Sequence, residues 1–357
     1  MNRNAERALA ACTCDVILAS DPFTVAWLTG FAPDVVSGPS PFAASPVAVA
    51  GADGRRVLVV SSDEEPSAAA TGWEVRSYEG FTVGPLDPHG GQRAVLADLR
   101  VGGRVAVEPH ALPASLASLL PAGTADASGT LRRLRAVKSP AEVERIRAAI
   151  QLCDAGQAAA RTAARPGLTE LELWSAVTAA MEQAAGERLP LLADLATGER
   201  TAEIGGPPGD RVLVEGDLVL CDLVPRLAGL WGDSCATFAL GEPPAGAREA
   251  HARACETLDA LAGALRPGAV AGDVDRLGRS AGLDYPHHTG HGLGCASHEE
   301  PRIVPDGETV LEPGMIVALE PGTYPRPWGL RVERVFLVTE HGAELLSGHD
   351  LRLDQTG

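Results

Sequence analysis

Short apolar runs bounded by turn-forming residues recur in the first third of the chain. They occur at residues 15–19, 56–60 and 104–108, and each is rich in aliphatic or β-branched residues. Such runs are typical of buried strands, and helical stretches separate them. We also expect a proline-containing helix near 113–120 and a loop at 122–129. The pattern predicts an α/β domain that ends near residue 130.

Helix-start signals organise the rest of the chain. A serine–proline pair at 139–140, followed by acids, predicts a helix to about residue 164. A second helix is expected over 169–181 and a third from residue 272, with strands between and after these helices. At 357 residues the chain is long enough for two cores, so we predict two domains, residues 1–130 and 131–357.

The net charge, the hydropathy and the cysteines limit the binding partners and the compartment that we expect. A formal net charge of -17 opposes binding to nucleic acid or to anionic membranes. The sequence has no apolar run of the length that crosses a bilayer, about 18 residues. Seven scattered cysteines are typical of reduced thiols, so we expect a cytoplasmic protein.

Two aspartates lie beside each other in a predicted hairpin. Asp222 lies inside the apolar run 217–224, where an unpaired carboxylate would be costly to bury. Asp233 follows eleven residues later, just before another apolar run, and residues 225–229 can form the turn. For one aspartate alone, a salt bridge or a strand-end cap explains the position about as well as a metal does.

Two more carboxylates lie in strand-like runs further along the chain. Glu320 follows residues 315–319, and Glu333 lies within 330–338. Because alternate strand residues share a face, Arg331 and Glu333 point the same way, and Arg331 can orient a carboxylate or the substrate. Four such acids predict a metal site.

A glycine-rich segment supplies the nitrogen ligand. Residues 287–298 contain four histidines, of which one is the expected ligand. Ligation by several oxygens and one imidazole suits two divalent cations such as Mn²⁺, held about 3.5–4 Å apart by bridging carboxylates. Co²⁺, Zn²⁺ and Fe²⁺ also suit this ligand set.

With this order of acids and histidine, the sequence resembles the pita-bread metallopeptidases, the family of methionine aminopeptidase, aminopeptidase P and proline dipeptidase. The resemblance implies the metal ligands Asp222, Asp233, His291, Glu320 and Glu333. It further implies that Asp233 and Glu333 bridge the metals and that Glu320 handles the proton of the bridging water, which becomes the hydroxide nucleophile. His287, His298 and Arg331 match accessory positions that bind substrate and stabilise the tetrahedral intermediate.

The resemblance covers nearly the whole chain. Residues 27–31 and 134–140 are similar to the creatinase-type N-terminal domain of Xaa-Pro peptidases and to its junction. It implies an α/β (α+β) architecture, with a creatinase-like first domain and a pita-bread catalytic domain. It also implies an Xaa-Pro aminopeptidase or dipeptidase that acts on small peptides and forms a homodimer.

Two positions depart from the family pattern. Gly205 stands where the family carries a histidine near the leaving group, and Ala236 stands where an arginine often follows the second aspartate. Arg200 and Glu203 are the charged candidates to replace the histidine, although both fit ordinary loop positions as well. Two alternatives to Xaa-Pro cleavage therefore stay open, a non-peptide C–N substrate and a non-catalytic peptide-binding protein.

Overall fold

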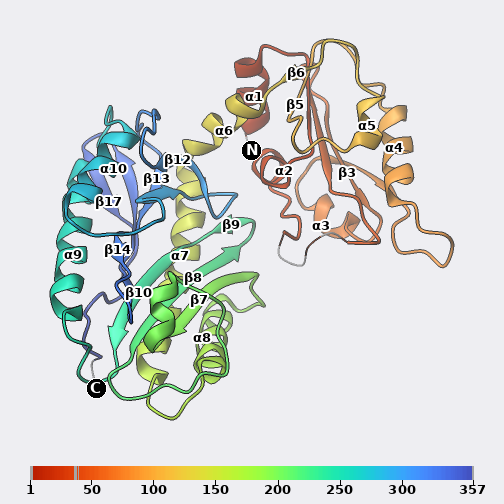
Figure 1. Cartoon of the computed structure of the whole chain (residues 1–357). Helices are drawn as coiled ribbons and strands as arrows, with labels where there is room; N and C mark the ends of the chain where they lie inside the picture. The colour runs from red at the N-terminus through yellow and green to blue at the C-terminus, as the bar shows by residue number, and fades with distance from the viewer. Residues whose placement is uncertain (1–2, 36–37, 39, 356–357) are drawn as a thin grey trace. The chain divides into compact units, whose positions relative to one another are not determined.

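A computed structural model describes residues 3–35, 38 and 40–355, which form two compact units, Met1–Arg135 and Ala136–Gly357. Both units mix helices with sheets, as predicted (Figure 1). Within the described residues, no helix has both the length and the apolar character needed to cross a membrane.

The first unit is built on a mixed six-stranded sheet in the order β4-β3-β2-β1-β5-β6. Its strands are β1 Val16–Ala19, β2 Val47–Gly51, β3 Arg56–Ser61, β4 Glu74–Tyr78, β5 Val105–Val107 and β6 Ala125–Asp126. Its helices are α1 Asn4–Cys12, α2 Pro22–Thr29, α3 Glu65–Ala69, α4 Pro88–Asp98, α5 Ala114–Ala117 and α6 Ser128–Ala136. The three predicted apolar runs are strands β1, β3 and β5.

The loop predicted at 122–129 is confirmed only at residues 122–124 and 127. Residues Ala125 and Asp126 form β6, which pairs in parallel with β5, and α6 begins at Ser128. Both β6 residues are exposed, so no hydrophobic alternation marks the strand in the sequence. The Asp126 carboxylate accepts a hydrogen bond from the Ser128 backbone N–H at 2.8 Å and so satisfies a free donor at the helix start. The helix predicted near 113–120 is shorter than expected, because α5 spans only Ala114–Ala117.

In the second unit, two sheets are each covered by a pair of helices. The first sheet has the order β10-β8-β7, with β9 beside β8, and the second has the order β12-β11-β13-β16-β17. Helices α7 and α8 pack on the first sheet, and α9 and α10 pack on the second (Figure 1). Separate apolar cores fill the two layers. The helices are α7 Pro140–Ala163, α8 Glu170–Ala185, α9 Ala247–Ala264, α10 Ala271–Ser280 and the 3-10 helix η1 Gly198–Glu203.

The strands of this unit are short outside the first sheet. They are β7 Leu191–Thr197, β8 Leu218–Leu227, β9 Leu230–Trp231, β10 Ser234–Ala239, β11 Gly290–Gly292, β12 Glu299–Ile303, β13 Ile316–Leu319, β14 Gly322–Thr323, β15 Leu330–Arg331, β16 Arg334–Thr339 and β17 Gly342–Leu345.

The predicted helix starts are confirmed, and one helix was not predicted. Ser139 and Thr169 each form a reciprocal capping box at the start of α7 and α8. Helix α10 begins one residue before the predicted start at 272. Helix α9 has no counterpart in the sequence prediction, because it begins after Gly246 without a side-chain cap.

The turn between the two predicted aspartate strands is tighter than expected. Pro225 lies within β8, and the chain turns only at Ala228 and Gly229, whose φ angles are 47° and 85°. Two successive positive φ angles match the twist of a two-stranded hairpin. The hairpin of β8 and β9 is therefore closed by two residues.

Gly232 allows the chain before Asp233 to lie directly against helix α7. A Cβ at this position would lie 2.6 Å from the backbone carbonyl carbon of Ala149 and 2.9 Å from the backbone nitrogen of Ile150. Backbone atoms of a packed helix cannot turn aside as a side-chain end can. This close approach therefore fixes the position of the neighbouring Asp233 relative to α7.

We predict that Gly232→Ala lowers the free energy of unfolding by roughly 1–3 kcal/mol, because α7 must shift to admit the methyl group. The matched control is Gly263→Ala in α9, where a Cβ meets no atom within 4 Å among the described residues. That change should stabilise the protein by about 0.5–1 kcal/mol through helix propensity. Urea unfolding measures both; equal effects of the two variants would refute the close-approach argument.

Candidate functional site

A cavity of about 380 Å³ in the second unit contains all the predicted site residues. Both sheets contribute to it, together with the loop before β11. The predicted residues that line it are Asp222, Asp233, His287, His291, His298, Glu320, Arg331 and Glu333. Residues separated by more than 100 positions in the sequence are therefore brought to one place.

The first sheet positions the two aspartates. Asp222 pairs with Cys235 across β8 and β10, and Asp233 directly precedes β10. The Glu333 backbone N–H donates to the Cys235 carbonyl at 2.9 Å, which ties the start of β16 to the same sheet. Asp233 and Glu333 are almost fully buried, with 3 % and 2 % of their surface exposed.

The second sheet positions the histidine and Glu320. His291 lies in β11 opposite Ala318 of β13, and Glu320 follows β13 directly. The His291 Nδ1–H donates a hydrogen bond to the Gly292 carbonyl oxygen at 3.0 Å. The other ring nitrogen, Nε2, lies 3.6 Å from Asp233 Oδ2 and 3.5 Å from Glu320 Oε1. The imidazole therefore joins the acids of both sheets.

Two overlapping groups of residues in the cavity could each hold a metal ion, because the ligand atoms within each group lie within 4.8 Å of one another. One group is Asp233, His291 and Glu333, and the other is His288, His291, His298 and Glu320. The buried Oε1 atom of Glu333 makes no hydrogen bond to any residue in the described part of the chain, and the buried Oε1 atom of Glu320 faces the imidazole nitrogens of His288 and His291 at 2.6 and 3.5 Å. Buried acceptors without donors are costly unless a cation neutralises them, so these residues fit a divalent metal.

Asp222 is the predicted ligand that lies outside both groups. Its Oδ2 atom accepts a hydrogen bond from Arg331 Nη2 at 2.5 Å. Burial raises the pKa of Asp222 to about 6, although the Arg331 charge opposes this shift. In this structure Arg331 therefore supplies the positive charge that Asp222 needs.

The charges of the buried acids are strongly coupled. Burial raises the pKa of Asp233 and of Glu333 well above the usual range. Asp222 and Glu320 raise both pKa values further, and Asp233 adds to the shift of Glu333. Burial also acts on Glu320, but His288, His291 and Arg331 outweigh it and hold its pKa below the usual range. Burial lowers the pKa of His291 to about 3, so its imidazole is neutral and can ligate a metal.

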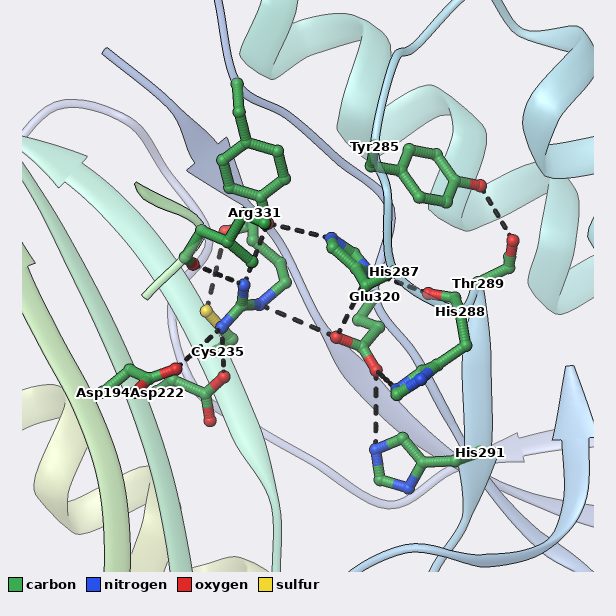
Figure 2. A network of polar contacts seen from close by, with 12 residues as sticks. Asp194, Asp222, Cys235, Tyr285, His287, His288, Thr289, His291, Glu320 and Arg331 are labelled. Atoms are coloured by element: carbon green, nitrogen blue, oxygen red, sulfur yellow. Dashed lines mark hydrogen bonds and ion pairs between the residues drawn. The ribbon is translucent and has the colours of Figure 1, made fainter. Parts of the chain in front are cut away.

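Arg331 is the centre of the polar network in Figure 2, where Glu320 lies between it and the histidines. Besides Asp222, its guanidinium lies 3.7 Å from Glu320 Oε2 and donates to the Ile204 carbonyl at 2.8 Å. Only 4 % of its side chain is exposed. The expectation that Arg331 orients carboxylates agrees with these contacts.

Hydrogen bonds from helix α10 hold the segment 285–289, which contains His287 and His288. Arg279 donates hydrogen bonds to the backbone carbonyls of Tyr285 and His287 at 3.1 and 2.8 Å, and its Nε pairs with the buried Asp275. Thr289 also donates to Asp275, at 2.6 Å. The segment before β11 is therefore fixed to α10.

Sequence reasoning missed three polar residues of the site. The Tyr324 hydroxyl lies 2.9 Å from both His287 Nε2 and Arg331 Nη1, and His288 Nε2 lies 2.6 Å from Glu320 Oε1. Asp194 lies 3.7 Å from Arg331. Only His288 had a signal, since it belongs to the predicted histidine cluster. Tyr324 and Asp194 reach the site through strand pairing and loop packing.

Arg200 and Glu203, the charged candidates to replace the histidine that Gly205 lacks, lie outside the cavity. Arg200 forms an ion pair with Glu170 and donates to the Pro207 carbonyl at 2.8 Å. Glu203 is exposed, and neither side chain lines the cavity. The second departure, Ala236, is fully buried in β10 and does not line the cavity either. Arg200 and Glu203 therefore behave as structural and surface residues.

Comparison with known families covers both units. Residues 144–340 match metallopeptidase family M24, and residues 3–137 match the Creatinase/Prolidase N-terminal domain. A relative named probable dipeptidase PepE, from Mycobacterium tuberculosis, is 35 % identical over 297 residues, which are 80 % of this chain and 77 % of that protein.

Solved structures extend the likeness along the chain. The dipeptidase PepE from Mycobacterium ulcerans is 27 % identical, with a TM-score of 0.80 over 99 % of this chain and 96 % of that one. The prolidase from Pyrococcus horikoshii OT3 has a TM-score of 0.82 over 99 % of this chain and 100 % of that one, at 23 % identity. At that lower identity the likeness concerns the fold alone.

We predict that Mn²⁺ stabilises the chelator-treated protein against heat. At a metal concentration of 100 Kd, binding to the folded state adds about 2.7 kcal/mol. Glu333→Gln, which keeps the shape of Glu333 but removes its charge, should lose most of this gain, whereas exposed Glu203→Gln should keep it. Thermal unfolding with and without Mn²⁺ measures the gain; an equal gain in Glu333→Gln would contradict the assignment.

We further predict that Tyr324→Phe lowers kcat of the metal-loaded protein by about tenfold, because it removes a hydroxyl shared by His287 and Arg331. Tyr78→Phe is the matched control, since among the described residues of the first unit its hydroxyl bonds only to the Ala44 backbone. That control should lower stability and leave kcat unchanged. An unaltered kcat in Tyr324→Phe would remove Tyr324 from the site.

Proposed function

Because the chain belongs to metallopeptidase family M24, we propose that it removes the N-terminal residue from short peptides whose second residue is proline. The observation that carries this proposal is the cluster of buried carboxylates, Asp233, Glu320 and Glu333, beside His291 in one cavity. The dipeptidase name of the PepE relatives supports a short peptide substrate, and the fold shared with prolidase supports the preference for proline.

The proposed ligands would hold two divalent ions. Asp233 and Glu333 would be the shared pair, because both are almost fully buried and their ligand atoms lie within 4.8 Å of one another and of His291. The remaining ligands would be Asp222, which Arg331 contacts in this structure, His291 and Glu320. Mn²⁺ is the proposed native ion because hard oxygen ligands predominate.

When bound, two such ions polarise the scissile carbonyl and lower the pKa of a water molecule bound to them to about 7. The side chains of this chain supply the rest. Glu320 is ionised at neutral pH because His288, His291 and Arg331 hold its pKa low, so it can accept the proton of the attacking water. His298 stacks on His291 with ring centroids 3.8 Å apart and can donate to the developing oxyanion. The His287 Nδ1–H donates to the His288 carbonyl and its Nε2 accepts from the Tyr324 hydroxyl, so His287 positions Tyr324 beside Arg331.

We also propose the roles of the two domains, the oligomeric state and the cellular compartment. Catalysis resides in residues 131–357, preceded by the creatinase-like domain over residues 1–130, and the working form is a cytoplasmic homodimer. All seven cysteines are free thiols, which fits a reducing compartment. Light scattering on a sizing column measures the oligomeric state, and a monomer would refute the dimer.

A second candidate function follows from Gly205. Without a donor at that position, the wall of the cavity differs from the family pattern, so a non-peptide C–N substrate is the alternative. A non-catalytic peptide-binding protein is the further alternative. Turnover of non-peptide amides, or peptide binding without turnover, would favour one of these over the peptidase.

We predict that the Mn²⁺-loaded protein hydrolyses Xaa-Pro dipeptides and longer Xaa-Pro peptides faster than controls without proline. Asp233→Ala combined with Glu333→Ala should abolish turnover, by a factor of at least about 10³, because both bridging ligands are lost. The double variant also excludes a contaminating peptidase. Two bound metals without turnover of any peptide would rule out the proposed activity.

A further inference from the structure

Asp194 is an acid of the cavity that the proposed mechanism does not use. It lies in β7 and pairs directly with Asp222 of β8. Residues opposite each other in antiparallel strands point to the same face of the sheet. Both aspartates accordingly line the cavity, and Figure 2 shows them side by side next to the guanidinium of Arg331.

Gly205 leaves the space that the Asp194 carboxylate occupies. A Cβ built on Gly205 would overlap the carboxylate oxygen of Asp194 and would lie 2.5 Å from its Cγ. The Leu195 backbone N–H donates to the Gly206 carbonyl at 2.9 Å, so β7 holds this loop in place. Glycine at 205 and an aspartate turned into the cavity at 194 therefore form one arrangement.

The Asp194 carboxylate has acceptor capacity to spare. Its nearest cation, Arg331 Nη2, is 3.7 Å away and already bonded to Asp222 at 2.5 Å. Among the described residues no side chain or backbone group donates a hydrogen bond to its oxygens. The side chain of Asp194 is 40 % exposed, compared with 15 % for Asp222. Asp194 is the outer acid of the pair, within reach of an incoming molecule.

The wall around Asp194 is apolar. Leu192, Ile204 and Val224 line the same cavity. A long aliphatic chain that ends in an ammonium group matches such a wall, because its methylene groups cover apolar surface while its charge reaches the acid.

We propose that Asp194 and Gly205 form an acidic subsite that selects substrates with a lysine-type side chain. The inference rests on the proposed peptidase function and names its preferred substrate class. The ammonium group pairs with the free oxygens of Asp194, and the alkyl stem packs on Ile204 and its neighbours. Asp194 is a specificity-determining residue in this account and takes no part in moving protons.

The test compares lysine with norleucine, which has the same alkyl chain without the charge. Each is placed first in Xaa-Pro dipeptides and third in Ala-Pro-Xaa peptides, and kcat/KM is measured with Mn²⁺-loaded protein. The wild type should prefer lysine at one of the two positions. Asp194→Asn should lower the ratio of kcat/KM for lysine over norleucine peptides about two- to fivefold, the range for a partly exposed ion pair. Glu203→Gln removes an exposed charge near the same loop and should change neither ratio.

A second variant tests the role of Gly205. Gly205→Ala should displace the Asp194 carboxylate and lower the lysine preference as Asp194→Asn does, and the double variant should lose no more than either single variant. Additive losses, or a lysine preference that survives Asp194→Asn, would overturn the subsite.

The proposed function and the subsite can fail separately. If norleucine and lysine peptides are both cleaved without a preference that depends on Asp194, the subsite is wrong and the peptidase stands. If the wild type cleaves no peptide, calorimetric titration with Lys-Pro and norleucine-Pro decides. Tighter binding of Lys-Pro that is lost in Asp194→Asn supports the subsite, and equal binding overturns it.

Discussion

The second unit depends on holding several carboxylates out of water within a few ångströms of one another. Asp233 and Glu333 are almost fully buried, and burial and the charges of neighbouring carboxylates both push their pKa values upward. A flexible chain would relieve this by turning the acids toward solvent. The fold prevents it, because each acid lies in or beside a strand and each sheet is covered by a pair of helices. A divalent cation is the natural counter-charge for such a rigid cluster.

Arg331 is the positive charge that the chain itself contributes to this cluster. It contacts Asp222 from the first sheet and Glu320 from the second, and it shares the hydroxyl of Tyr324 with His287. An arginine with 4 % exposure keeps its charge and its planar geometry, so it holds the two sheets in a fixed relation around the cavity. Its position explains why the acids of different sheets stay aligned.

The cavity wall beside Gly205 is where this chain departs from the family pattern. The acids and His291 lie where the family pattern predicts them along the sequence, whereas the space next to Gly205 is filled by the carboxylate of Asp194. A side chain at position 205 and the Asp194 carboxylate would need the same volume, so the position of Asp194 depends on glycine at 205.

Local patterns determined much of this protein. The capping residues Ser139 and Thr169 fixed where α7 and α8 begin, and apolar runs marked β1, β3 and β8, because these signals depend only on neighbouring residues. The order of acids and the histidine cluster indicated the site residues, whose role as ligands stays a prediction.

Other features were decided only by tertiary structure. Strand β6 exists because β5 lies beside it, and α9 forms without a capping signal. Tyr324 reaches Arg331 through loop packing, and Asp194 enters the cavity through its register with Asp222. Such contacts join residues far apart in the sequence, so no local pattern encodes them, and only the packed sheets bring them together.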